Sequence, residues 1–214
     1  QAPSVAGTNT LDLPASSGTL LTTTGNGSQL TGLTTSYAGT KTLIINGNMA
    51  IAQRGTSSTL SSYGYLIDRW ATNPFGTSTT ISQSTSVPSG FQYSLKTLRP
   101  ASNTDITPRM AMQTIESNNC YDLSSQTVTL SFWAKAGANF SAASNTLNIQ
   151  LTTGTTADQG GVIYYSWAGA ANPINVTQAL TTTWTKYSFT GTLGAGILEA
   201  AVIFYYTPVG TAGA

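Results

Sequence analysis

The side chains able to carry out chemistry are few in this sequence, and most of them are carboxylates. Histidine is absent and cysteine occurs once, so neither a Cys/His zinc site nor a nucleophile activated by histidine can be assembled. A glycosidase needs two carboxylates that face each other across a sugar, and no two acidic residues lie close together in the sequence. We therefore predict no catalytic residue and no enzymatic activity. The 7 acidic residues are Asp12, Asp68, Asp105, Glu116, Asp122, Asp158 and Glu199.

Calcium is the one metal that the acidic residues leave open. Asp105, Asp122 and Asp158 fall in expected loops, where carboxylate and carbonyl oxygens can coordinate this ion. The sequence has no aspartate-rich loop of the EF-hand kind, and acids in loops are most often simply solvated. We therefore predict neither a metal site nor a cofactor, with calcium as the alternative.

The low charge of the chain excludes two classes of partner. Charged residues make up 7% of the sequence and the formal net charge is +1, so the basic surface expected of a nucleic-acid-binding protein is missing. No apolar run approaches the roughly 20 residues needed to cross a membrane. Hydrophobic residues still form 40% of the chain, enough to build a core. We predict no nucleic-acid partner and no membrane insertion.

Aromatic side chains are the best candidates for binding a ligand. Exposed Trp and Tyr rings present flat apolar faces on which sugar rings can stack, while neighbouring amides and hydroxyls bond the sugar hydroxyls. Trp133 falls on the polar side of its expected strand, and Tyr165 and Trp167 belong to an aromatic cluster just before a loop. We predict these three as carbohydrate-binding residues. The alternative is that the rings pack in the core or at a subunit interface.

The elements that must position these side chains are strands. In residues 127–135 the apolar and polar side chains alternate, as expected for a half-buried strand. Shorter windows at residues 91–95, 147–151 and 187–189 repeat this alternation, and residues 200–206 read as a strand buried on both faces. We predict an all-β fold of about seven to nine strands over residues 41–214, forming a two-sheet jelly-roll sandwich.

Residues 1–40 differ from the rest of the chain. They are rich in Ser, Thr and Gly, and their leucines are too sparse to close a core. Such a segment orders most easily by packing on neighbours, for example on copies of itself. We predict an extended N-terminal arm that anchors the protein or drives its oligomerisation. The alternative is a flexible linker.

Four segments also carry a resemblance to a known family: LDLPASSGTLLTTTG at residues 11–25, LIINGNMAIAQRG at 43–55, YLIDRW at 65–70 and VTLSFWAK at 128–135. The first resembles the arm repeat of bacteriophage tail-fibre proteins. The other three resemble the carbohydrate-binding-module-like C-terminal domain of phage fibres and related virion proteins.

This resemblance implies a jelly roll, a homotrimer, a place on the virion, and contacts with other virion proteins through residues 1–40. Family members usually continue past the Tyr-Tyr strand into one more strand, so the resemblance implies that this domain lacks its last strand. It transfers no catalytic residue. We predict a non-enzymatic tail-fibre or spike domain that binds a host cell-surface glycan. The alternative is a structural head-fibre, decoration or tail-shaft protein with no receptor role.

Two of these segments also have a structural interpretation of their own. Asn46 and Gly47 predict a tight turn after a strand at residues 43–45. Asp68, Arg69 and Trp70 predict a carboxylate–guanidinium pair set against an indole, which would fix a corner of the sandwich.

Overall fold

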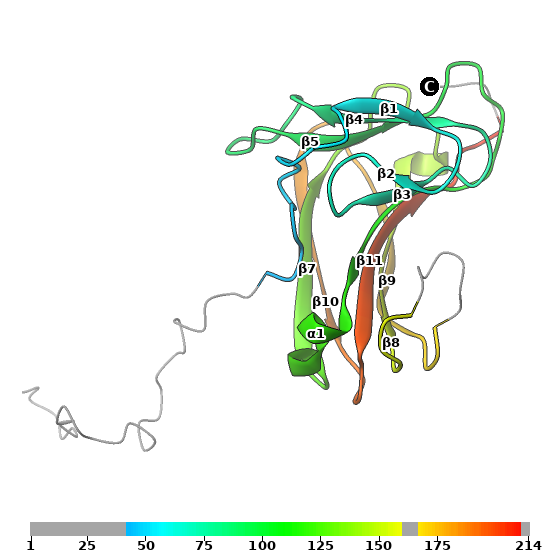
Figure 1. The fold of residues 1–214 in the computed structure, drawn as a ribbon. Helices are drawn as coiled ribbons and strands as arrows, with labels where there is room; N and C mark the ends of the chain where they lie inside the picture. Colours follow the sequence, from blue (N-terminus) through cyan, green and yellow to red (C-terminus); the bar gives the residue numbers. More distant parts are fainter. Residues whose placement is uncertain (1–41, 160–166, 211–214) are drawn as a thin grey trace, which may run out of the picture. The chain divides into compact units, whose positions relative to one another are not determined.

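The computed structural model describes residues 42–159 and 167–210, and the predicted arm at residues 1–40 lies outside them (Figure 1). The described residues form 11 strands in three sheets, with one short helix, α1 (Ser117–Cys120), and two short 3-10 turns. No described helix is long and apolar enough to cross a membrane. The strands are β1 (Ser57–Leu60), β2 (Gly64–Tyr65), β3 (Ala71–Asn73), β4 (Thr79–Ser84), β5 (Ser94–Leu98), β6 (Arg109–Ile115), β7 (Thr127–Ala134), β8 (Thr146–Gly154), β9 (Ala171–Ala179), β10 (Thr185–Thr192) and β11 (Glu199–Tyr206).

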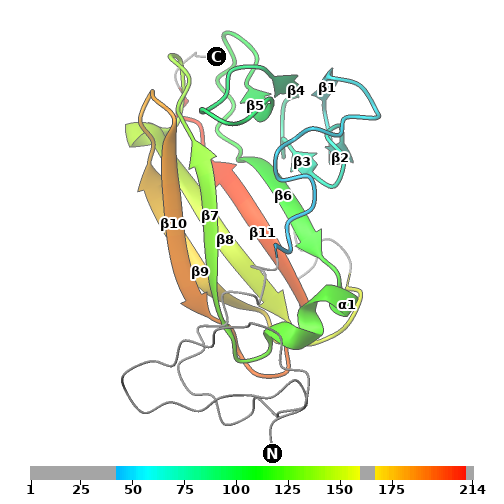
Figure 2. The same cartoon turned by 90° about the vertical axis from the view of Figure 1, so that its left-hand side faces the viewer.

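Two of the sheets form a sandwich. The larger has six antiparallel strands in the order β2-β3-β6-β11-β8-β9, and the antiparallel pair β10-β7 packs on one side of it (Figure 2). Successive strands β6, β7 and β8 alternate between the two sheets, and β9, β10 and β11 do the same. This alternation is that of a jelly roll, so the predicted architecture is confirmed, whereas the 11 strands exceed the predicted seven to nine because the short strands β1 to β5 build a third sheet and an edge of the largest one. The third sheet, β1-β4-β5, lies at one end of the sandwich.

The core between the two sheets follows directly from the alternation in β7. Every second side chain from Val128 to Ala134 is partly buried, and the intervening ones are exposed. The ring of Phe132 lies 4.7 Å from that of Phe204 on β11 and 6.3 Å from that of Phe189 on β10. Strand β7 therefore joins the two layers through one face and leaves the other to solvent.

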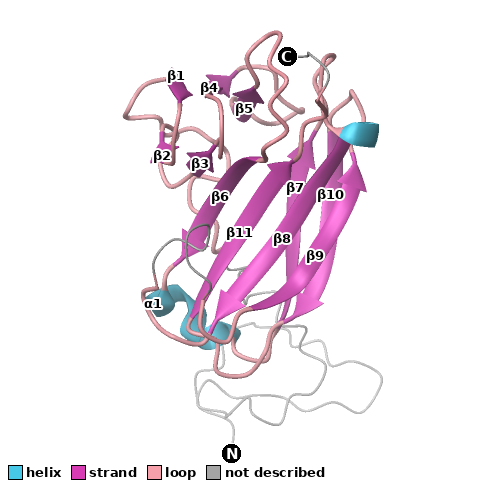
Figure 3. Ribbon diagram, turned by 90° about the vertical axis from the view of Figure 1, so that its right-hand side faces the viewer, coloured by secondary structure: helices cyan, strands magenta, loops and turns pink. Residues whose placement is uncertain are grey.

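Strand β11 is buried on both faces, as predicted. It lies between β6 and β8 in the centre of the large sheet (Figure 3). Val202 belongs to the core cluster facing β7 and β10, whereas Ala201 and Ile203 belong to a second cluster on the other side of the sheet. A central strand covered on both faces accounts for its continuous run of apolar residues.

The strand predicted at residues 43–45 does not form. The backbone of Ile45 is held by one side chain instead: Ile45 N–H donates to Gln113 Oε1 (2.7 Å), and Gln113 Nε2 donates back to Ile45 O (2.8 Å). Gln113 on β6 is 1% exposed. Its amide makes the two bonds that a neighbouring strand would have made, so Leu43 and Ile44 pack partly buried on the core without a ladder.

Two further local predictions can be compared with the structure. The turn at Asn46 is confirmed, with φ of 54° at Asn46 and a bond from Met49 N–H to Asn46 O (3.0 Å). In the window at residues 91–95 the strand starts later than predicted, because β5 begins at Ser94.

The corner at residues 68–70 is built differently from its prediction. Asp68 and Arg69 do not pair with each other: Arg54 Nη1 lies 3.3 Å from Asp68 Oδ1, and Arg69 pairs with Glu116. Arg69 has a φ of 72°, so its backbone is left-handed and the regular alternation of side chains is interrupted there. The carboxylates of Asp68 and Glu116 therefore pair with two different arginines, Arg54 and Arg69.

The indole of this corner is structural, as expected. Trp70 is 5% exposed, its Nε1 donates to Asn46 O (3.1 Å), and its ring lies 6.2 Å from that of Phe204. Asn46 Nδ2 in turn donates to Asp68 O (2.9 Å), and Gln83 Nε2 on β4 donates to Met49 O (2.6 Å). Side chains thus attach residues 45–49 to the domain.

Candidate functional site

The side of the six-stranded sheet that points away from β7 and β10 carries tyrosines near one edge and polar side chains on β8 and β9, with the buried apolar residues Ala71, Met112 and Ile203 between them. Figure 3 is turned towards this side of the sheet, where β6, β11, β8 and β9 run next to one another. We call it the tyrosine–amide face. Its members are Tyr63 next to β2, Tyr65 on β2, Tyr205 on β11, Asn148 and Gln150 on β8, and Asn175 and Thr177 on β9.

Strand register is what brings these side chains together. Gln150 is paired with Ile203 on one side and with Asn175 on the other. Asn148 is likewise paired with Tyr205 and with Thr177. Because directly opposed residues of a sheet project from the same face, the two rows form one surface across β11, β8 and β9.

The amides of this surface are held in fixed orientations. Gln150 Nε2 donates to Asn175 Oδ1 (3.1 Å), and Thr177 Oγ1 donates to Asn148 Oδ1 (2.7 Å). Among the residues that the structure describes, nothing bonds Gln150 Oε1 or Asn175 Nδ2. These two atoms supply an acceptor and a donor for a ligand that has both functions on each unit, as a sugar hydroxyl does.

The aromatic part of the surface lies at the other edge of the sheet and at its centre. The rings of Tyr63 and Tyr65 meet edge to face, with centroids 5.5 Å apart and hydroxyl oxygens 2.7 Å apart. Tyr65 is 44% exposed, and the Arg54 guanidinium lies 5.9 Å from its ring centroid. Tyr205 is partly exposed and packs against the apolar cluster of this face. Flat rings and fixed amides therefore occur on one surface.

Trp133 and Trp167, two of the three residues predicted to bind carbohydrate, do not lie in one site. Trp133 is 40% exposed on the outer side of β7. Trp167 is 3% exposed and packs on Met112 and Ile203, on the side of the six-stranded sheet that also carries the tyrosine–amide face and therefore opposite Trp133 across the sandwich. Its burial rules out the stacking role predicted for its exposed ring and assigns it to packing. Tyr165 lies outside the described residues.

Sequence reasoning missed the amide face altogether. Asn148, Gln150 and Asn175 look like ordinary polar positions of alternating strands. Their shared face depends on the pairing of β8 with both β11 and β9, which the order of strands along the chain does not specify. The alternation of Leu147, Ile149 and Leu151 was a usable signal, because it implies that the residues between them point away from the core.

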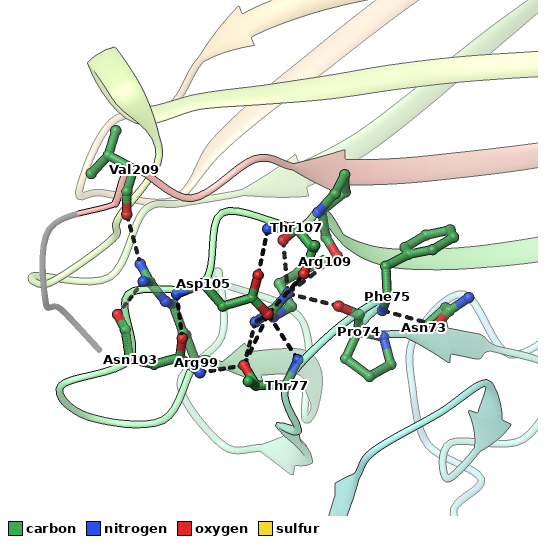
Figure 4. Close-up of polar contacts among 11 residues, drawn as sticks. Asn73, Pro74, Phe75, Thr77, Arg99, Asn103, Asp105, Thr107, Arg109 and Val209 are labelled. Atoms are coloured by element: carbon green, nitrogen blue, oxygen red, sulfur yellow. Dashed lines mark hydrogen bonds and ion pairs between the residues drawn. The ribbon is translucent and has the colours of Figure 1, made fainter.

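Two of the three loop acids considered for calcium, Asp105 and Asp158, make contacts within the protein. Asp105 accepts hydrogen bonds from the backbone N–H groups of Thr77 and Thr107 (2.8 Å each) and forms an ion pair with Arg109 (3.2 Å), as Figure 4 shows. The two backbone bonds hold the pKa of Asp105 far below its usual range. Asp158 Oδ1 accepts a bond from Ser117 Oγ (3.2 Å). Within residues 42–159 and 167–210, no group of three or more metal-ligating side chains gathers.

Glu199 gives a pH prediction of unusual sign. It is 2% exposed at the start of β11, and burial, together with the charges of Asp158 and Glu116, raises its pKa. A carboxyl whose pKa is raised in the folded state stabilises the fold at pH values below its usual pKa of 4.5. This contribution is lost as the pH rises through the folded-state pKa. The Glu199→Gln variant removes the buried charge and keeps an acceptor for Gln159 N–H. We therefore expect the Tm of this variant to exceed that of the parent by a few degrees at pH 7.5 and to match it at pH 4.

The matched control for this prediction is Glu116→Gln. Burial opposes ionisation of Glu116, but the hydrogen bond and charge of Arg69 outweigh it and lower the pKa. This variant should therefore lose stability at pH 7.5. Melting curves of both variants in the same buffers test the pair, and a lower Tm for Glu199→Gln at pH 7.5 would contradict the assignment.

Comparison with known proteins gives similarities to solved structures. No protein-family model matches the sequence, and no curated protein matches it. The chain is similar to the tandem CBM22-1–CBM22-2 domain of Paenibacillus barcinonensis Xyn10C, with 18% identity over 67% of this chain and 39% of that one (TM-score 0.44). It is also similar to the CBM22-1 xylan-binding domain of the same protein, with 10% identity over 80% of this chain and 86% of that one (TM-score 0.41). A third similarity is to the enzymatically active domain of bacteriophage CBA120 tailspike protein 4, with 15% identity over 79% of this chain and 20% of that one (TM-score 0.35).

Proposed function

We propose that this protein binds a carbohydrate chain through the tyrosine–amide face and does not cleave it. The observation that carries the proposal is the register of β11, β8 and β9, which places Tyr205 in line with fixed amides on one surface. Amides that both donate and accept, next to a partly exposed ring, match the alternating hydroxyl and apolar C–H surface of a sugar.

The dimensions and charge of the face define the ligand further. Neighbouring strands lie about 4.8 Å apart, so the row of Tyr205, Asn148 and Thr177 on β11, β8 and β9 spans roughly 10 Å and accommodates about two sugar units. The outward-facing residues of β8, from Asn148 to Thr152, carry no charge. Their register partners on β9 and β11 carry none either. An oligosaccharide without charged groups is therefore the ligand that fits this face.

Two alanine variants test this proposal. Tyr205→Ala removes the central ring, and Gln150→Ala removes an amide whose oxygen has no described partner. We expect each to weaken binding of a glycan selected from an array by roughly tenfold, the value of one or two lost hydrogen bonds or of a ring contact. Titration calorimetry with the selected glycan measures the change.

The matched controls are Tyr121→Ala and Gln126→Ala. Tyr121 is a tyrosine that is 58% exposed in a 3-10 turn outside the face, and Gln126 is an exposed glutamine just before β7. Both control variants should bind like the parent. Equal affinities for all four variants would refute the site.

We further propose that the glycan belongs to a host cell surface and that the chain is a homotrimeric virion component. The resemblance of residues 11–25, 43–55, 65–70 and 128–135 to phage fibre proteins supports this. Three copies would turn weak single-site binding into useful avidity. Immunogold electron microscopy with antibody against residues 42–214 tests the location, and label at the tip of a tail appendage is the expected result. Label spread over the head would favour a decoration protein instead.

A further inference from the structure

The outer side of the β7–β10 pair is a second polar surface, on the opposite side of the sandwich from the tyrosine–amide face (Figure 2). One end carries hydroxyl pairs: Thr127 and Thr192 Oγ1 atoms are 3.1 Å apart, and those of Thr129 and Thr190 are 3.0 Å apart. The other end carries two tryptophans and two lysines. We call this end the tryptophan–lysine patch, and its members are Trp133, Lys135, Trp184 and Lys186.

In the patch, each tryptophan is paired with a lysine from the neighbouring strand. Trp133 on β7 is directly opposite Lys186 on β10. Lys135, just after β7, has its Nζ 5.4 Å from the centroid of the Trp184 ring and 2.9 Å from Ser86 Oγ. The two lysines are therefore diagonal neighbours in the register, with Cα atoms about 7 to 8 Å apart. One anionic group can lie between their ammonium groups.

The charge of the patch is not balanced by the protein. Arg54, Arg69 and Arg109 each form an ion pair with a carboxylate. By contrast, no carboxylate of the described residues pairs with Lys135 or Lys186, and neither β7 nor β10 contains an acidic residue. In a chain with so few charges, these two lysines form a local excess of positive charge that attracts an anion.

The aromatic members specify what kind of anion would be bound. Trp133 is 40% exposed, so its ring is available for stacking beside the ammonium of Lys186. Two lysines are too few to track a phosphate backbone, and the net charge of +1 gives no wider basic field. A flat apolar ring next to a cation pair, with hydroxyls further along the strands, suits a sugar ring that carries an acid group.

We propose that the tryptophan–lysine patch binds an acidic saccharide, with a sugar ring over Trp133 and its acid group between Lys135 and Lys186. The acid can be a carboxylate, as in a uronic acid, or a sulfate ester, since both present anionic oxygens to ammonium groups. This site is separate from the tyrosine–amide face, so the protein has one face for uncharged carbohydrate and another for acidic carbohydrate.

The test uses the full chain and three oligosaccharides of matched length. A galacturonic acid hexamer carries carboxylates, its fully methyl-esterified form has the same backbone without charge, and a dextran sulfate oligosaccharide carries sulfates. Titration at 50 mM NaCl should show binding of the hexamer or of the sulfated probe, and at least tenfold weaker binding of the ester. Which anionic probe binds identifies the acid group. Affinity should fall as NaCl is raised, because salt screens exposed charges.

Lysine variants assign the binding to the patch. Lys186→Gln should weaken the affinity at least tenfold, and Lys186→Arg, which keeps the charge, should retain most of it. The matched control is Lys96→Gln, which removes an exposed lysine on β5 and so changes the net charge equally. Trp133→Ala should weaken binding of the acidic probe, while Gln150→Ala on the other face should leave it unchanged.

Three results would overturn the proposal: no binding of either anionic probe at millimolar concentration, equal losses for Lys96→Gln and Lys186→Gln, or equal affinity for the ester. A loss on Gln150→Ala would move acidic binding to the tyrosine–amide face and also overturn it. Binding of an uncharged glycan is measured separately, so the two faces can fail independently.

Discussion

Replacing Asp105 with alanine is expected to lower the free energy of unfolding by about 3 to 5 kcal/mol. The reason is that the partner charge is buried: the side chain of Arg109 is 0% exposed, and Asp105 is its one carboxylate partner among the described residues. Asp105 also bonds the backbone of Thr77, before β4, and of Thr107, before β6, so its loss releases two loops. Figure 4 shows these bonds converging on one carboxylate.

Urea unfolding at pH 7 measures this change, and pH supplies a second check. Because the folded-state pKa of Asp105 is depressed, its contribution is present above its usual pKa of 3.8 and is lost as pH falls below that value. The difference between Asp105→Ala and the parent should therefore shrink in acid. Lys96→Gln, which removes an exposed charge on β5, is the control and should differ from the parent by less than about 0.5 kcal/mol. A similarly small effect of Asp105→Ala would contradict the role of the buried pair.

Phe132→Ala is expected to cost about 3 kcal/mol or more, because it opens a cavity between the two sheets. The ring of Phe132 lies 4.7 Å from Phe204, 5.8 Å from Tyr187 and 6.3 Å from Phe189. It is therefore one of the contacts that hold β7 and β10 on β11, beside Val128, Leu130 and Phe189. Without it the pair β7–β10 would lose part of its attachment to the larger sheet.

The neighbouring residue provides the control for this variant. Trp133→Ala removes a larger aromatic side chain, but from the solvent side of the same strand. We expect it to cost less than about 1 kcal/mol. Thermal or urea unfolding of the two variants compares the two faces of β7 directly. Equal losses would show that the sheets are not joined through Phe132.

The parts of the fold that could be predicted are those in which burial alone determines the residue pattern. Residues 127–135 alternate because one face of β7 meets the core, and residues 200–206 are continuously apolar because β11 is covered twice. The strand expected at residues 43–45 did not form, since a buried glutamine side chain took the place of a partner strand. Nothing in the local pattern distinguishes these two solutions, because both bury the same apolar residues.

The candidate site was harder to predict because it depends on which strands are neighbours. Trp167 was a reasonable candidate from its setting before a loop, but its ring is buried against Met112 and Ile203. Gln150 and Asn175 are 25 positions apart and meet through the β8–β9 pairing. The tryptophan–lysine patch was half predicted, since Trp133 was identified as outward-facing, whereas Lys186 required the register of β7 with β10.

The way residues 45–49 are attached has a mechanical consequence. Strands pulled along their length resist force because many ladder bonds are loaded together. Here the backbone is held by separate side-chain bonds from Gln113, Trp70 and Gln83. Tension applied at residue 42 would load these bonds one after another and not together, so this segment should detach before the sandwich unfolds.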